Sequence, residues 1–345
     1  MANRFAGMLA RASLRVGQVR VTWGRGTSPS ERRDRGNGER ADFETRSAAK
    51  SRIGMPIYSI DPHLPWREGP MFFNFNEDDP MHRGMLEFFA HGSCYEAEVA
   101  SFLARVLKPG DVFFDVGANC GFFSILGGLL VGPSGSVVAF EPVGDNVAEI
   151  GINIEANGLD NVVIVQRPLS NRVEDVEIHI NSDSRGGHAL WDPAQFPGNV
   201  HSTVTHQSIR CTATTLADEV AALGGGRAPK AVKIDTEGAE ALILEGGRSV
   251  LRPADIPFVV AELHEFGLAM LGASQDSLRS MMHDLGYECF LLQLDGSLPK
   301  LVPLGTRIVS SYILNVLFAE AEALAHYWRE ETVGPKLQPD QPRLA

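Results

Sequence analysis

The chain has few cysteines and none of the long apolar runs that membrane helices need. Its 345 residues include only 4 Cys, none paired at zinc-ligand spacing and too few for a disulfide framework. The longest apolar stretch, 122–131, is interrupted by Ser124 and is about half as long as a membrane-spanning helix. No apolar signal core stands near Met1. These absences exclude an integral membrane segment and predict a cytoplasmic protein.

Basic residues are scarce over most of the chain. The net charge is −12, yet residues 1–50 hold ten Arg and one Lys against five acidic residues, so the remaining 295 residues carry −18. An acidic body argues against nucleic acid as a partner. Residues 1–50 have few large apolar side chains, and we expect a disordered basic tail there. Alternatively, the first twenty residues form a basic amphipathic helix or a transit peptide.

The rest of the chain has the pattern of one α/β domain. Short apolar strands alternate with helices, and this order predicts right-handed crossovers and a mainly parallel sheet with helices on both faces. The expected organisation is a tail at 1–50, a lead-in segment at 51–94 packed on the main domain, the main domain at 95–330 with a variable loop at 181–208, and a C-terminal tail at 331–345.

A glycine turn follows the strand that begins at Asp111. Ligands of an open parallel sheet bind beyond the carboxyl ends of its strands. The turn lacks the G-x-G-x-x-G spacing of dinucleotide sites, because Gly117 and Gly121 are four residues apart. A pyrophosphate is therefore disfavoured. S-adenosylmethionine has no phosphate, and Asp115 can receive the ammonium of its amino-acid end.

A second acid supports the same cofactor. Glu141 ends the next strand, and its carboxylate can accept both hydroxyls of a ribose. NAD and S-adenosylmethionine both need such a group, and the glycine spacing favours the methyl donor. A nicotinamide-dependent oxidoreductase and a non-catalytic binding module remain as alternatives.

Two further strand ends carry the candidate acceptor site. Lys233 and Asp235 share one face of a strand because side chains alternate, so Lys233 is either a buried partner of Asp235 or a catalytic group. Asp235 or His264 is the expected general base for a hydroxyl acceptor, with Glu237 orienting. Together with Glu262 these side chains can alternatively hold a divalent metal. Segments far apart in sequence do not fix a coordination geometry, so no metal ligand is assigned.

Four motifs occur in the order seen in FkbM-family methyltransferases, which this chain resembles from roughly Cys94 to Phe318. They are DVGANCGFFS at 115–124, FEP at 140–142, KIDTEGAE at 233–240 and AELHE at 261–265. The resemblance implies a class I, Rossmann-like methyltransferase fold whose sheet has seven strands, the last one antiparallel. It also implies S-adenosylmethionine as cofactor and O-methylation of a small-molecule or glycan acceptor, such as a sugar or a natural-product scaffold.

Carried over by position, the resemblance also assigns cofactor contacts. The methionine part would lie against the glycine turn, the ribose against the acid after the next strand, and the adenine near the third strand. In that order the residues are Asp115, Gly117, Ala118, Asn119 and Gly121, then Glu141, then Ser170.

Overall fold

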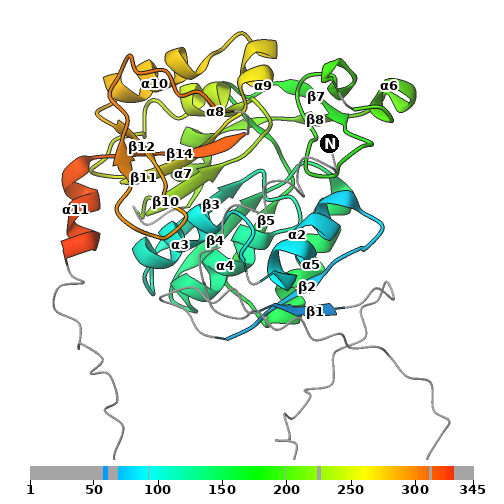
Figure 1. Ribbon diagram of the computed structural model, residues 1–345, viewed down its shortest axis with the longest axis horizontal. Coiled ribbons are helices and arrows are strands. Elements are labelled where there is room, and N and C mark those ends of the chain that lie inside the picture. Colours follow the sequence, from blue (N-terminus) through cyan, green and yellow to red (C-terminus); the bar gives the residue numbers. More distant parts are fainter. Residues whose placement is uncertain are drawn as a thin grey trace, which may run out of the picture.

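An eight-stranded, mostly parallel sheet forms the centre of the molecule (Figure 1). The computed structural model describes residues 57–60, 69–91, 93–197, 199–223, 227–310 and 313–329. In sheet order the strands are β13 (Lys300–Leu301), β12 (Glu288–Leu291), β14 (Leu314–Ala319), β11 (Phe258–Leu263), β10 (Ala231–Ile234), β3 (Val112–Val116), β4 (Ser136–Phe140) and β5 (Val162–Val165). The five strands from β11 to β5 pair in parallel, and β14 runs antiparallel to β11 and β12.

The strand count departs from the expectation of seven. The additional strand, β13, is only two residues long and pairs antiparallel with β12. Both of its residues are exposed, so no run of buried apolar side chains marks it in the sequence. The predicted α/β class, the mainly parallel sheet and the antiparallel last strand are confirmed.

Helical layers cover both faces of the sheet (Figure 1). Successive side chains of a strand point to opposite faces, so Phe113 packs into one apolar cluster and Phe114 into the other. The layer on the Phe113 side contains α3 (Ala97–Val106), α4 (Phe122–Val131) and α11 (Ala321–Arg329), with α5 (Gly144–Asn157) beside α4. The layer on the Phe114 side contains α7 (Leu216–Ala222), α8 (Glu240–Gly246), α9 (Glu265–Met270) and α10 (Gln275–Asp284).

The described part of the lead-in segment packs on α4 and α5. It consists of β1 (Ile57–Ile60), β2 (Met71–Asn74) and α2 (Pro80–Ala90). Phe73 stacks on Phe122 of α4 with ring centroids 5.6 Å apart, and the Asn74 backbone N–H donates to the Asn153 side chain of α5 at 2.7 Å. The hairpin therefore shares the core of the main domain.

A separate hairpin carries the variable loop. Its strands are β7 (Asp175–Ile180) and β8 (Gln207–Thr212), and the loop between them contains the short helices η1 (Pro193–Gln195) and α6 (Ser202–Thr205). A small parallel pair, β6 (Leu169–Ser170) with β9 (Thr214–Thr215), joins the hairpin to the main domain.

The two predicted tails, 1–50 and 331–345, lie outside the described residues. Within the described part of the chain, none of the helices has the length and apolar character needed to cross a bilayer.

Candidate functional site

Two adjoining hollows open at the carboxyl ends of β3, β4 and β10. They measure about 590 and 720 Å³, including the space open to solvent. Five residues line both of them, namely Gly117, Asn119, Gly186, Asp235 and Glu237. Molecules held in the two hollows therefore meet at these residues.

The alternation of side chains along the strands decides which hollow each residue lines. Val116 and Phe140 point toward the α7–α10 layer and line the first hollow. Asp115, Lys233 and Glu262 point to the opposite face and line the second hollow. The sheet edge thus separates the two hollows and supplies polar groups to the place where they join.

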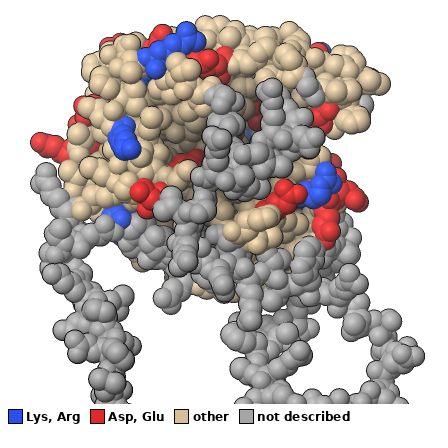
Figure 2. Space-filling model, in the orientation of Figure 1, with Lys and Arg blue, Asp and Glu red and all other residues tan. Residues whose placement is uncertain are grey.

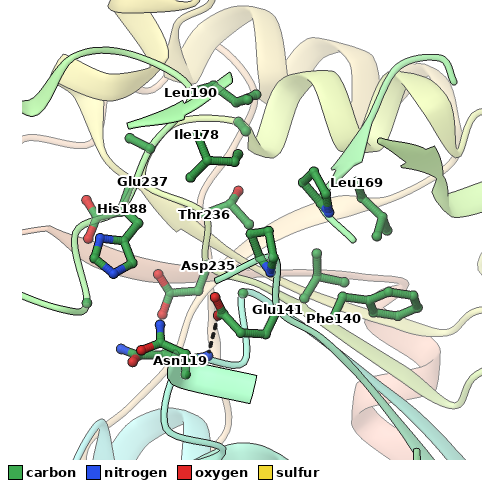
Figure 3. A pocket seen from close by; sticks show the side chains of 18 of the residues that line it. Asn119, Phe140, Glu141, Leu169, Ile178, His188, Leu190, Asp235, Thr236 and Glu237 are labelled. Carbon is green, nitrogen blue, oxygen red and sulfur yellow. Dashed lines mark hydrogen bonds between the residues drawn. The ribbon is translucent and has the colours of Figure 1, made fainter. Parts of the chain in front are cut away.

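Glu141 supplies a buried carboxylate to the lining of the first hollow (Figure 3). Its carboxylate accepts hydrogen bonds from the backbone N–H groups of Asn119 and Val143, both at 2.9 Å. Burial raises the pKa of Glu141 to about 7, although these hydrogen bonds favour the charged form. The carboxylate faces the same space as Asp235 (Figure 3). Apolar side chains line the hollow beside it, from Phe140, Leu169, Ile178 and Leu190.

The glycine turn brings the backbone of β3 against that of β10. Gly117 has φ +83°, and a Cβ there would lie 1.8 Å from the carbonyl oxygen of Asp235, so no other residue fits. Asn119 also has positive φ, and its Oδ1 is buried without a hydrogen-bond partner among the described residues. This oxygen is therefore free to accept from a bound molecule.

The variable loop forms the roof of the first hollow. Arg185 reaches across to α5, where its guanidinium lies 3.1 Å from the Glu149 carboxylate and donates to the Asn146 side chain at 3.0 Å. Glu149 also pairs with His82 of α2 at 3.0 Å. A Cβ on Gly186 would lie 3.0 Å from the sulfur of Met81. The variable loop thus contacts both α2 and α5 on the opposite side of the first hollow.

Lys233 lies at the centre of the charged groups of the second hollow. Its ammonium is 2.6 Å from Asp235 and 3.6 Å from Glu96, and it lies 4.5 Å over the ring of Phe123. Burial opposes the charged form, but these carboxylates outweigh it and raise the pKa of Lys233. The pairing of Lys233 with Asp235 expected from the strand period is therefore present.

Glu96 is a site residue that sequence reasoning missed. It precedes α3 with a φ of +41° and accepts a hydrogen bond from the Asn315 side chain of β14 at 3.2 Å. The sequence shows only an acid ahead of a helix. Its contact with Lys233 follows from a fold that brings α3, β10 and β14 together.

Acidic and apolar side chains share the lining of the second hollow. Among the described residues that line it, Lys233 is the one Lys or Arg, against five carboxylates. The acids are Glu96, Asp115, Asp235, Glu237 and Glu262, and the large apolar side chains are Met81, Met85, Tyr95, Phe122 and Phe123.

His264 lies behind Glu237 and lines neither hollow. Its Nδ1 is 2.9 Å from Oε2 of Glu237, a residue held at φ +56°. Trp191 donates to the Glu237 carbonyl at 2.6 Å, and the rings of Trp191 and Phe196 lie edge-on to the imidazole. Burial lowers the pKa of His264, but the Glu237 carboxylate raises it by more.

The sequence profile of the methyltransferase FkbM domain matches residues 115–289, which is half of the chain and contains both sets of strand ends that form the hollows. The chain belongs to the FkbM methyltransferase family. This membership sets aside the oxidoreductase alternative.

Relatives of this chain are distant. Hexuronic acid methyltransferase AglP of Haloferax volcanii is 25% identical over 169 residues, covering 49% of this chain and 62% of that protein. The chain thus spans less than two thirds of that relative.

Solved structures with similar folds are also distant in sequence. The methyltransferase FkbM structure from Methylobacillus flagellatus has a TM-score of 0.37 and 13% identity, covering 69% of this chain and 53% of the other. A SAM-dependent O-methyltransferase from Thermotoga maritima has a TM-score of 0.35 and 13% identity, covering 65% and 63%. The family match, not these low scores, carries the assignment.

The fold brings most of the predicted site residues together. Those that line a hollow are Glu141 in the first, Asp115 and Ala118 in the second, and Gly117, Asn119, Asp235 and Glu237 in both. Three predicted residues line neither: Gly121, Ser170 and His264. Gly121 precedes α4 with φ +82°, and Ser170 is buried in β6, where its neighbour Leu169 lines the first hollow instead.

Proposed function

We propose that this chain transfers a methyl group from S-adenosylmethionine to a hydroxyl group of a sugar or another polyhydroxylated molecule. The observation that carries the proposal is the junction of the two hollows at Asp235 and Glu237. A methyl donor in the first hollow and an acceptor in the second would meet there. Holding two reactants in this way is the main contribution an enzyme makes to a direct displacement.

The residues of the first hollow suit S-adenosylmethionine. The Glu141 carboxylate can accept from ribose hydroxyls. The sequence assigned the ammonium of the methionine part to Asp115, but Asp115 lines the second hollow and accepts from Ser124 at 2.6 Å. We therefore assign this ammonium to the unpartnered Oδ1 of Asn119. The apolar side chains beyond Glu141, among them Leu169 and Ile178, offer a surface for adenine. When bound, this cofactor supplies an electrophilic methyl carbon on a sulfonium.

Asp235 is the proposed general base. It lies at the junction, whereas His264, the other candidate from the sequence, lines neither hollow. Lys233 holds one carboxylate oxygen at 2.6 Å, which fixes the side chain and leaves the other oxygen for the acceptor. As the acceptor oxygen bonds to the methyl carbon, its proton passes to Asp235 and the electrons of the broken C–S bond stay on sulfur.

The lining of the second hollow suits a neutral sugar. Carboxylates accept hydrogen bonds from hydroxyl groups, and the rings and thioethers pack on the apolar face of a pyranose. AglP is named for a hexuronic acid, which supports a sugar acceptor. An anionic uronate would meet five carboxylates in the second hollow, so we propose a neutral sugar instead.

The test begins with ligand binding. S-adenosylmethionine should raise the melting temperature of the full chain and NAD should not, because only a ligand of the native state stabilises it. Release of S-adenosylhomocysteine is then followed with methyl glucoside and methyl glucuronide as acceptors, and the glucoside should react faster. Stabilisation by NAD alone would overturn the proposal.

Asp235→Asn tests the assigned base. With an acceptor that supports turnover, the variant should lose on the order of 10²–10⁴-fold in turnover while its cofactor affinity changes little. Asp255→Asn, an exposed position outside the hollows, is the matched control. Unchanged turnover in Asp235→Asn would remove general-base catalysis by this residue, and cofactor binding without any turnover would favour a binding module.

A further inference from the structure

We propose that Glu237, Glu262 and His264 bind a divalent transition-metal ion, such as Mn²⁺, in the wall of the second hollow. The inference rests on the proposed function, because the ion would lie beside the acceptor. The three residues come from two segments, the turn after β10 and the end of β11. The sequence offered them, with Asp235, as possible metal ligands but gave no geometry, which the structure supplies.

The distances bring one ligand atom of each residue close enough to approach a shared ion. One ligand atom from each residue lies within 4.8 Å of the other two, and the Glu237 and His264 atoms are 2.9 Å apart. Two neighbouring ligands of an octahedral ion with bonds of about 2.1 Å are separated by about 3 Å. The pair therefore has the separation that adjacent ligands require.

The orientation of the groups points to a common third partner. His264 Nδ1 is paired with Glu237 at 2.9 Å, whereas its Nε2 has no hydrogen-bond partner among the described residues. Oε2 of Glu262 is likewise buried and unpartnered within the described part of the chain. Both residues are more than nine-tenths buried, with exposed fractions of 5% and 8%. Leaving such groups unsatisfied is costly, and a bound cation would satisfy them together.

The local charge favours a cation. Four acidic side chains, Asp235, Glu237, Glu240 and Glu96, are the largest charge influences on Glu262. Lys233 does not neutralise this group, since its ammonium is paired with Asp235 and Glu96. Asp235 is for the same reason not counted among the proposed ligands.

The ligand set indicates the type of ion and its use. Two carboxylates and one imidazole suit Mn²⁺ or Zn²⁺ better than Ca²⁺, which prefers oxygen ligands alone. Three protein ligands leave positions open, and Glu237 and Glu262 both line the acceptor hollow. An ion there would lower the pKa of an acceptor hydroxyl and help Asp235 to remove its proton.

Binding of Mn²⁺ to the full chain, without cofactor, tests the site. Electron paramagnetic resonance of free Mn²⁺ should show one equivalent bound. Glu262→Gln and His264→Gln should each raise the dissociation constant by at least ~10–100-fold, because losing a ligand should cost no less than losing a group that only orients one. Glu265→Gln, an exposed neighbour outside the cluster, should bind Mn²⁺ like the wild type.

Melting temperature and S-adenosylmethionine affinity, the latter by calorimetry in EDTA, show whether each variant is folded. A wild type that binds no Mn²⁺, or folded variants that bind it equally well, would overturn the metal site. If the chain binds no Mn²⁺ and Glu262→Gln weakens cofactor binding, the cluster stabilises the positive charge of the cofactor instead of a metal ion. S-adenosylmethionine binding by the wild type in EDTA leaves the proposed methyltransferase function standing in either case.

Discussion

Glu141 links the glycine turn to the end of β4 through a single carboxylate. Its two oxygens accept from the backbone of Asn119 and of Val143, so the side chain orders the turn as well as facing the first hollow. Each oxygen still has a lone pair for a ligand hydroxyl. A substitution here therefore acts on the loop and on the bound molecule, and two variants are needed to separate these effects.

Glu141→Ala should weaken S-adenosylmethionine binding by ~1–3 kcal/mol, because it removes a charged hydrogen-bond acceptor. Glu141→Gln keeps one carbonyl oxygen for the backbone and should lose less. Calorimetry on both variants, with the exposed Glu155→Gln of α5 as control, measures the difference. If Glu141→Ala binds the cofactor like the wild type, the ribose assignment is wrong.

At the scale of elements, the β7–β8 hairpin is the part that completes the site. It supplies Arg185, Gly186 and His188 to the first hollow, and Trp191 to the carbonyl of Glu237. The sequence pattern of residues 181–208 has no clear period, and it predicted a variable loop near the substrate cleft without its individual contacts. Its contacts are made by isolated polar and aromatic side chains, which leave no periodic signal.

Arg185→Ala should loosen this roof without unfolding the domain. The guanidinium makes two contacts with α5, and the side chain is 28% exposed. Removing these contacts should weaken the attachment of the variable loop to α5 by on the order of 1 kcal/mol. The dissociation rate of S-adenosylmethionine, measured by stopped flow, should rise ~3–10-fold, while the melting temperature without cofactor stays nearly constant. Arg172→Ala, an exposed arginine paired with Glu174, is the control. An unchanged dissociation rate would mean that the roof does not retain the cofactor.

At the scale of the whole molecule, the buried carboxyl groups have a larger effect on the pH dependence of stability than the acidic side chains on the surface. Figure 2 shows acidic and basic side chains in small mixed groups on the described part of one face, where solvent screens them. By contrast, Glu96, Glu141 and Glu240 are each held by burial at a pKa of about 7. Glu240 is 0% exposed and accepts from the backbone of Thr236 and Gly238, so it holds the turn that carries Glu237.

These carboxyl groups make the protein without cofactor more stable at lower pH. The pKa of Glu240 lies at about 7 in the folded chain against 4.5 ordinarily, so the folded state binds the proton more tightly. The stability gained is complete below pH 4.5 and is lost as the pH rises through 7. For each such group, the free energy of unfolding should fall by about 1 kcal/mol between pH 6 and pH 8, which lowers the melting temperature by ~2–4 °C.

Glu240→Gln should therefore raise the melting temperature more at pH 8 than at pH 6, because glutamine imitates the protonated acid and the wild type already regains part of this stability at pH 6. Differential scanning calorimetry of the full chain measures both. Glu245→Gln on the same helix removes the same charge from a half-exposed position and should show no such pH dependence. If both substitutions change the melting temperature equally at pH 8, the change in net charge, and not burial of Glu240, causes the pH dependence.

Sequence alone determined the features that depend on local order. The alternation of strands and helices predicted the parallel sheet, and the rule that ligands bind at strand ends selected Asp115, Gly117, Glu141 and Asp235. The two-residue period predicted the contact between Lys233 and Asp235. The sheet and the Lys233–Asp235 contact are confirmed, and the selected residues line the hollows, because each of these features follows from spacing along one strand or from the shared direction of parallel strands.

Only the tertiary structure decided the contacts between distant segments. It added β13 as an eighth strand, brought Glu96 to Lys233, and showed that His264 lies behind Glu237 under Trp191 instead of facing a hollow. It also gathered the three proposed metal ligands from two segments that local spacing does not relate. Such contacts depend on how helices and loops pack across the sheet edge, and packing between remote segments has no period along the chain.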